Sequence, residues 1–129
     1  MVRRNVAFAL MPLTLMACTK QEPQTPPPVS PAAEVVGPAQ DCLPLSQFSN
    51  TNIRDDWTID FIGAGNRVWR VTLPNRCPGL RSAGTFTYST SLSQLCRQDI
   101  IFPLNRVGSG FQRGAGCGLA PFTPVRLIR

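Results

Sequence analysis

Aspartates are the side chains of this chain that come closest to catalytic chemistry. The sequence has no histidine, so the commonest general base and metal ligand is missing. Its one lysine, Lys20, lies in a proline-rich stretch, which leaves the rest of the chain without a lysine nucleophile. A pair of carboxylates could still act as acid and base, as in a glycosidase. A polymer hydrolase that uses Asp55, Asp56 or Asp99 is therefore one hypothesis for this chain.

Structural roles explain several of these aspartates more simply. Asp55 and Asp56 directly precede a run that predicts a strand, and aspartate at such a place favours a cap or a turn. Asp60 lies inside that run, where the pattern predicts Arg70 as its cross-strand partner. We therefore expect a non-catalytic protein and keep the hydrolase as the alternative.

Arginine supplies all the positive side chains of residues 41–129. This segment has ten arginines and five aspartates, so its formal charge is +10 − 5 = +5. A guanidinium pairs bidentately with a carboxylate or a phosphate. A genome rich in G and C, which favours arginine codons without any ligand, is the alternative explanation. We predict that an anionic ligand contacts Arg67, Arg70, Arg76, Arg81, Arg106 and Arg113.

Four of the five cysteines form an even set that suits two disulfides in an oxidising compartment. Three pairings are possible. We favour Cys77–Cys96, which closes a local loop, with Cys42–Cys117, which joins the start of the segment to its end. A zinc site is disfavoured because the chain has no CxxC pair and no histidine. The glycines of residues 108–114 lack the following helix that a dinucleotide site needs, so we expect no cofactor.

The fifth cysteine, Cys18, follows a typical export signal. Arg3 and Arg4 are basic, and residues 6–17 are apolar but too few to span a bilayer as a helix. Leu15-Met16-Ala17-Cys18 resembles the lipobox of bacterial lipoproteins. The resemblance implies that residues 1–17 are removed and that Cys18 is lipidated. The alternative is an ordinary signal peptide with an incidental cysteine.

The position after Cys18 bears on its destination. It holds Thr19 rather than aspartate, and in Gram-negative lipoproteins this favours the outer membrane over the inner membrane. We therefore expect the chain to be anchored there by lipid and to face the periplasm. Residues 18–40 hold six prolines and no aromatic residue, and such a stretch cannot bury enough apolar surface to fold. We interpret it as a disordered spacer in a polyproline II-like form, with a PxxP ligand as the alternative.

Residues 41–129 are predicted to form one β-rich domain. Residues 57–62 and 67–73 each alternate at period two around a glycine-rich turn, which indicates a β-hairpin. If Phe61 faces Trp69, then Ile59 faces Val71 and one face of the hairpin is wholly apolar. The same register sets Asp60 opposite Arg70 on the other face.

The remaining elements are shorter. We predict a strand over residues 85–88 with Phe86 and Tyr88 facing inward, and a buried strand over residues 99–104. The leucine spacing of residues 91–97 indicates a turn or two of helix, capped by Ser89 or Thr90. Residues 107–118 are expected to be a loop, and residues 119–129 to add a last strand. The expected fold is a small antiparallel β-sandwich or open barrel with a short helical turn, stapled by two disulfides.

Residues 41–129 carry a series of short motifs: Asp41-Cys42, residues 54–59, residues 69–73, Cys77-Pro78-Gly79-Leu80, Leu95-Cys96, Asp99-Ile100, Cys117-Gly118-Leu119 and residues 122–125. Together they resemble small exported proteins and lipoproteins of proteobacteria that share a four-cysteine domain of unknown function. The resemblance covers nearly all of residues 41–129 and implies one disulfide-stapled domain, with no activity and no catalytic residues attached. The positive charge and the predicted address, rather than the resemblance, favour an envelope binding or support module that meets an anionic envelope component or an envelope protein, and no nucleic acid.

Overall fold

A computed structural model describes residue 12 and residues 24–129 of the chain. Arg3, Arg4 and Cys18, which carry the predictions of export and lipidation, lie outside the described residues. Among the described residues, no helix has the length and the apolar character needed to cross a bilayer.

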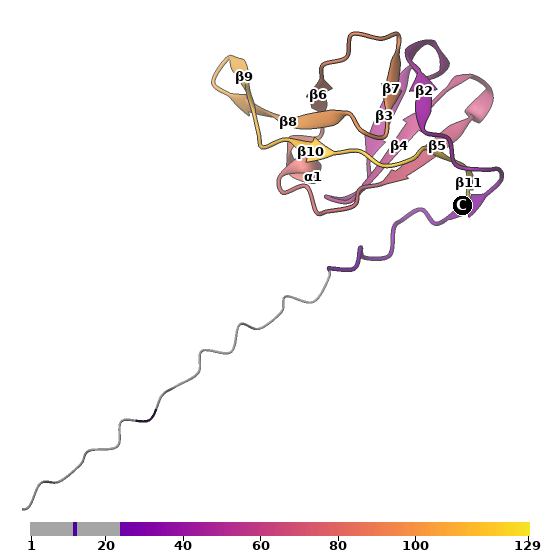
Figure 1. The fold of residues 1–129 in the computed structure, drawn as a ribbon, viewed down its shortest axis with the longest axis horizontal. Coiled ribbons are helices and arrows are strands. Elements are labelled where there is room, and N and C mark those ends of the chain that lie inside the picture. The colour runs from indigo at the N-terminus through magenta and orange to yellow at the C-terminus, as the bar shows by residue number, and fades with distance from the viewer. Residues whose placement is uncertain (1–11, 13–23) are drawn as a thin grey trace, which may run out of the picture.

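The larger sheet has five antiparallel strands in the order β1-β11-β5-β4-β3 (Figure 1). Its centre is the predicted hairpin, and every pair of the predicted register is present: Ile59 opposite Val71, Asp60 opposite Arg70, and Phe61 opposite Trp69. The predicted last strand pairs with β5 in the same sheet. The strands are β1 (Ala33–Val35), β3 (Asn50–Ile53), β4 (Thr58–Ile62), β5 (Val68–Thr72) and β11 (Thr123–Leu127).

The second sheet is built around one long strand. It has the order β10-β8-β6, and β9 pairs with the outer part of β8. A separate two-stranded ladder joins β2 to β7. The strands are β2 (Cys42–Pro44), β6 (Phe86–Tyr88), β7 (Gln94–Cys96), β8 (Ile100–Val107), β9 (Gly110–Arg113) and β10 (Cys117–Gly118).

Three short helical segments connect the strands. They are η1 (Leu45–Gln47), η2 (Ala64–Asn66) and α1 (Leu80–Ala83). The fold is therefore mainly β, with antiparallel sheets that do not close into a barrel and with two disulfides, which confirms the predicted fold class.

The hydrophobic core lies between the sheets and is centred on Phe61. Its ring makes edge-on contacts with Phe48, Phe86 and Phe122, at centroid distances of 5.0, 6.2 and 5.3 Å. Pairs of this geometry each contribute about 0.5–1.5 kcal/mol beyond the area that they bury. Leu43, Leu95 and other residues from β2, β7 and β8 complete the core, so all the sheets share it.

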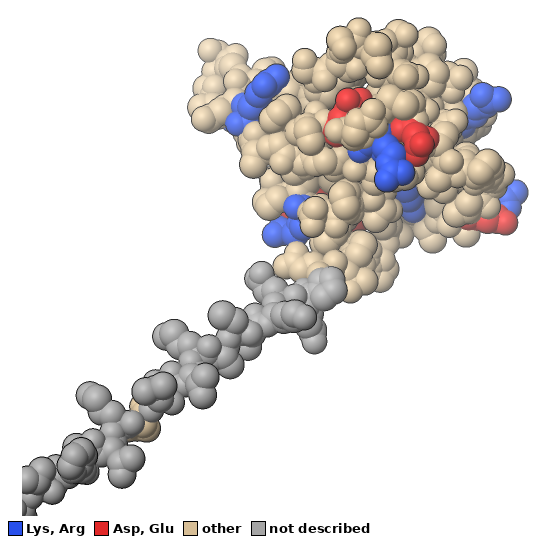
Figure 2. Space-filling view, in the orientation of Figure 1, with Lys and Arg blue, Asp and Glu red and all other residues tan. Residues whose placement is uncertain are grey.

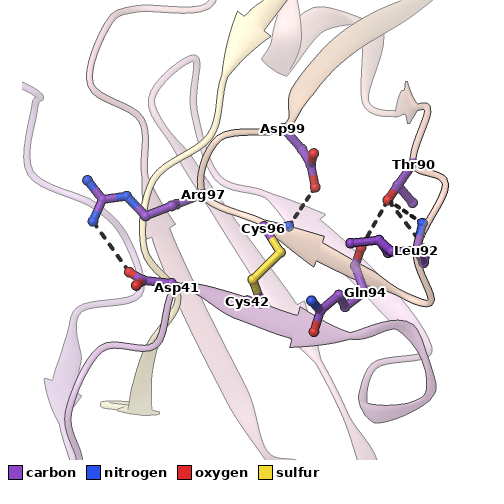
Figure 3. The surroundings of a disulfide bond; sticks show 8 residues. All are labelled: Asp41, Cys42, Thr90, Leu92, Gln94, Cys96, Arg97 and Asp99. Atoms are coloured by element: carbon purple, nitrogen blue, oxygen red, sulfur yellow. Dashed lines mark hydrogen bonds and ion pairs between the residues drawn. A yellow bond between two sulfur atoms is a disulfide. The ribbon is translucent and has the colours of Figure 1, made fainter.

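The segment predicted as a helix, residues 91–97, contains strand β7 instead. Thr90 does cap this segment, but it caps a turn: its hydroxyl accepts a hydrogen bond from the Leu92 amide at 3.2 Å and lies 3.2 Å from the Gln94 carbonyl (Figure 3). The leucine spacing was misleading because β2 offers this segment a partner for its backbone, and tertiary pairing overrides a short local pattern.

Both predicted disulfide pairings are wrong. The structure joins Cys42 to Cys96 and Cys77 to Cys117, in place of Cys77–Cys96 and Cys42–Cys117. The reason for the first bond is the β2–β7 ladder, whose register places Cys42 directly opposite Cys96 (Figure 3). Once residues 94–96 form a strand, Cys96 is committed to β2, and Cys77 is left for Cys117 of β10.

The folded region begins earlier than the predicted boundary at Asp41. Strand β1 lies within the predicted spacer and pairs with β11, and Gln40 forms a bridge with Phe122. The proline content suggested an unstructured segment, but an edge strand needs few apolar residues because its backbone makes the pairing. The spacer prediction is thus corrected for residues 33–40.

Candidate functional site

The aspartates of the hydrolase hypothesis all make structural contacts. The Asp55 carboxylate accepts a hydrogen bond from the Trp57 amide at 2.7 Å. Asp99 accepts one from the Cys96 amide at 2.7 Å (Figure 3). Asp56 pairs with Arg76 at 2.8 Å and also accepts a hydrogen bond from the Arg81 amide. These contacts stabilise turns next to strands and disulfides, and they give no support to a shared acid–base pair.

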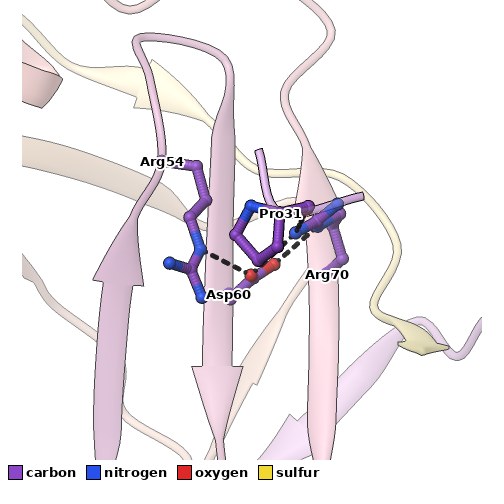
Figure 4. Close-up of polar contacts among 4 residues, drawn as sticks. All are labelled: Pro31, Arg54, Asp60 and Arg70. Carbon is purple, nitrogen blue, oxygen red and sulfur yellow. Dashed lines mark hydrogen bonds and ion pairs between the residues drawn. The ribbon is translucent and has the colours of Figure 1, made fainter. Parts of the chain in front are cut away.

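The two other aspartates of the domain are ion-paired. Asp41 lies 3.3 Å from Arg97 at the surface (Figure 3). Asp60 is fully buried between Arg54 and Arg70, which approach its oxygens at 2.8 and 2.7 Å (Figure 4). Among the described residues, no group of three or more histidine, cysteine, aspartate or glutamate side chains could hold a metal ion.

The six predicted anion contacts do not form one basic patch. Arg70 is engaged by Asp60, and Arg76 by Asp56. Arg67 lies at the β4–β5 turn and Arg81 in α1, so each is on a different element. Figure 2 agrees, because basic side chains on the face shown lie apart from one another with uncharged surface between them.

Arg106 and Arg113 are the two predicted contacts that the structure brings together. Both lie on the hairpin of β8 and β9, which projects from one end of the molecule (Figure 1). All residues from 105 to 113 are exposed. Gly108, whose φ of +58° favours glycine, forms the turn. We call residues 104–113 the arm. Sequence reasoning assigned most of it to a loop, because the glycines of the turn concealed the alternation of β9.

The arm displays its arginines and aromatic rings on one face. Residues paired across two strands share a face, as do alternate residues along a strand. The register pairs Leu104 with Arg113 and Arg106 with Phe111, and Phe102 lies two positions before Leu104. The opposite face begins with Ile101 and Pro103, which are buried in the core. We call Phe102, Leu104, Arg106, Phe111 and Arg113 the Arg–Phe face.

Stacking orders both guanidinium groups of this face. Arg113 lies over the ring of Phe102 at 4.6 Å, and Arg106 lies over Phe111 at 5.6 Å. Such cation–π contacts are worth about 0.5–1 kcal/mol at exposed sites. Neither arginine makes an ion pair with any described residue, and the chain has no acidic residue after Asp99. The N–H groups at the edges of both guanidinium planes thus remain able to bind an anion.

The tip of the arm is apolar as well as basic. Phe111 is 61% exposed and Val107 is 56% exposed. Exposed apolar side chains next to arginines are typical of surfaces that enter the headgroup region of a bilayer. Comparison of the chain with models of protein families, with curated proteins and with solved structures finds no match.

Proposed function

We propose that this chain is a lipoprotein, anchored through Cys18, whose non-catalytic β domain binds the anionic lipid surface of the bacterial envelope through the arm. The observation that carries the proposal is the Arg–Phe face, where two arginines flank an exposed ring and have no acidic partner among residues 24–129. Phosphate groups of lipids pair with guanidinium, while Phe111 and Val107 can enter the apolar boundary below them. An acidic protein surface would satisfy the arginines but not the apolar tip.

The predicted spacer is long enough for this contact. Figure 1 shows the arm at one end of the molecule and β11, next to β1, toward the other. Residues 18–30 at the polyproline II rise would span at most about 40 Å. A domain of this size has a diameter of about 30 Å. The domain can therefore turn so that the arm meets the same membrane that holds the lipid.

The anchor is tested by Cys18→Ser. We expect this substitution to move the protein from the membrane fraction to the soluble fraction of cells, because one residue carries all the acyl chains. Retention of the Cys18→Ser protein in high-salt-washed membranes would contradict lipid anchoring.

The arm is tested separately, in the mature chain, residues 18–129, with Cys18→Ser and without the export signal. We expect it to sediment with vesicles that contain phosphatidylglycerol and not with purely zwitterionic vesicles, and to dissociate as salt is raised. Each arginine near an anionic surface contributes about 1 kcal/mol, so Arg106→Gln with Arg113→Gln should weaken partitioning about thirtyfold. Phe111→Ser should weaken it further at high salt, where the apolar contact dominates.

A matched control is the double variant Arg97→Gln with Arg126→Gln. It removes the same charge, but these arginines pair with Asp41 and Glu34 away from the arm. We expect it to bind vesicles nearly as well as the parent. Equal loss in both double variants would show that net charge rather than the arm drives binding, and the proposal would fail.

A further inference from the structure

A groove of about 430 Å³ lies where η2, the end of η1, the start of β5, β11 and the β1–β2 connection meet. Its volume is within the range of small-ligand sites and suits a di- or tripeptide. It is separate from the Arg–Phe face, because the two share no residue.

One wall of the groove carries hydrogen-bonding side chains with no carboxylate among them. These are Gln40, Gln47, Asn66 and Arg67, and among the described residues none of the four side chains makes an ion pair. Arg67 gives this wall a positive charge that no lining residue neutralises. The charge therefore selects an anionic ligand, and the amides add donors and acceptors for neutral polar groups beside it.

The backbone holds this wall in place. The Gly63 amide donates to the Arg67 carbonyl at 2.8 Å, and Asn66 has a φ of +62°, so the turn that presents Asn66 and Arg67 is closed. Gln40 exchanges two backbone hydrogen bonds with Phe122, at 2.9 and 2.8 Å. Fixed backbone on both sides means that a ligand need not order the loops, which lowers the cost of binding.

The other wall is apolar. Val36, Val68, Val125 and Pro124 line it, and Val36 is 58% exposed. A sugar acid would satisfy Arg67 and the amides but would place hydroxyl groups against these side chains. A peptide that ends in an apolar residue fits both walls, since its last residue carries both the terminal carboxylate and the side chain that would contact the valines.

From this arrangement we infer that the groove binds the free C-terminal carboxylate of a peptide with an apolar last residue. Arg67 pairs with the carboxylate, Gln40, Gln47 and Asn66 hydrogen-bond the last peptide groups, and Val36, Val68 and Val125 contact the last side chain. This is a second binding site, independent of the lipid-binding role proposed for the arm.

The test is an NMR titration of the mature chain, residues 18–129 with Cys18→Ser, with N-acetyl-Ala-Val. We expect shifts of the side-chain amide signals of Gln40, Gln47 and Asn66 and of the Arg67 Nε–H signal. The matched peptide with a C-terminal amide should bind about tenfold more weakly, because it lacks the charge-assisted hydrogen bond. Arg67→Gln should weaken the acid peptide about tenfold and leave the amide peptide unchanged.

Arg81→Gln is the control, because Arg81 is an exposed arginine outside the groove. It should bind both peptides as the parent does. Equal binding of acid and amide, no shift at millimolar peptide, or the same shifts with glucuronate would each overturn the inference. Shifts confined to the arm would also overturn it, while the vesicle result would stand on its own.

Discussion

At the scale of single residues, Asp60 is the most constrained ionisable group of the domain. Its carboxylate is fully buried and binds Arg54 through one oxygen and Arg70 through both (Figure 4). The Asp60–Arg70 pair was predicted from the hairpin register and is confirmed. Arg54 was not predicted, because it follows β3, and no alternation in the sequence signals that this strand lies beside β4.

Asp60→Asn should destabilise the domain by about 3 kcal/mol, because it leaves Arg54 and Arg70 without a compensating charge in a site that solvent barely reaches. Urea unfolding followed by tryptophan fluorescence would measure the loss. The substitution keeps the size of the side chain, so the effect reports charge rather than packing.

Asp41→Asn is the matched control for that measurement. It removes the same group from an ion pair with Arg97 in which the Asp41 side chain is 72% exposed. Exposed pairs are worth about 0–1 kcal/mol, so the midpoint should hardly move. A loss as large as that of Asp60→Asn would contradict the account based on burial.

At the scale of elements, the period-two alternation of side chains predicts a strand correctly where one face is apolar and the other is polar. Residues 57–62 and 67–73 show it, and their register was predicted residue by residue. It failed for Gln94–Cys96, which is too short to set a period, and for Gly110–Arg113, where glycine obscures it. The first strand, β7, is defined by its partner β2, and a partner distant in sequence leaves no local signal. The second strand, β9, follows its partner β8 directly, so there only the obscured alternation was at fault.

The residues of the arm are predicted only in part from the sequence. The positive charge of the domain predicts Arg106 and Arg113 as anion contacts, but nothing in the sequence predicts that they share a face. Phe102 and Phe111 were missed because their role depends on the β8–β9 register. The composition of the sequence predicts that the site is rich in arginine, whereas the residues that share a face follow from the strand pairing.

The β4–β5 hairpin depends on glycine at its turn. A Cβ at Gly63 would lie 2.3 Å from the Gln47 carbonyl oxygen and 2.9 Å from the Trp69 ring. We expect Gly63→Ala to cost about 1–3 kcal/mol, because backbone and a buried ring cannot both move away. Gly110→Ala is the control, since a Cβ there meets nothing within 4 Å. The midpoints of thermal unfolding of the two variants should differ clearly. Equal midpoints would show that η1, which carries the Gln47 carbonyl, can move away from the added Cβ.

At the scale of the whole molecule, the disulfides join segments that are distant in sequence. Cys42–Cys96 spans 54 positions and Cys77–Cys117 spans 40. Loops of this length correspond to about 4 kcal/mol for each bond through the unfolded chain. Replacing Cys77 and Cys117 together by alanine should therefore lower the unfolding free energy by several kcal/mol. Non-reducing peptide mapping should recover the two observed pairs, and a Cys77–Cys96 fragment would contradict the β2–β7 ladder.

The start of the folded unit is also a property of the whole molecule, because β1 contacts β11 and Pro31 contacts the centre of the larger sheet. The Pro31 carbonyl accepts a hydrogen bond from Arg70 at 3.0 Å (Figure 4). Glu34 pairs with Arg126. This stretch thus closes the outer side of the Asp60 site as well as one sheet edge. A chain that begins at Asp41 keeps all four structural cysteines but loses these contacts.

A chain that begins at Ala39 should therefore be less stable than one that begins at Pro28, by about 2–3 kcal/mol. The charged hydrogen bond to Pro31 accounts for most of this, since such bonds contribute about 1.5–3 kcal/mol, and the freed edge of β11 adds to it. A chain that begins at Gln24 serves as the control and should match the Pro28 chain, because residues 24–28 are exposed. Urea unfolding of the three chains decides the boundary: equal stability of all three would restore the spacer up to residue 38, whereas a loss confined to the Ala39 chain places the end of the spacer before β1.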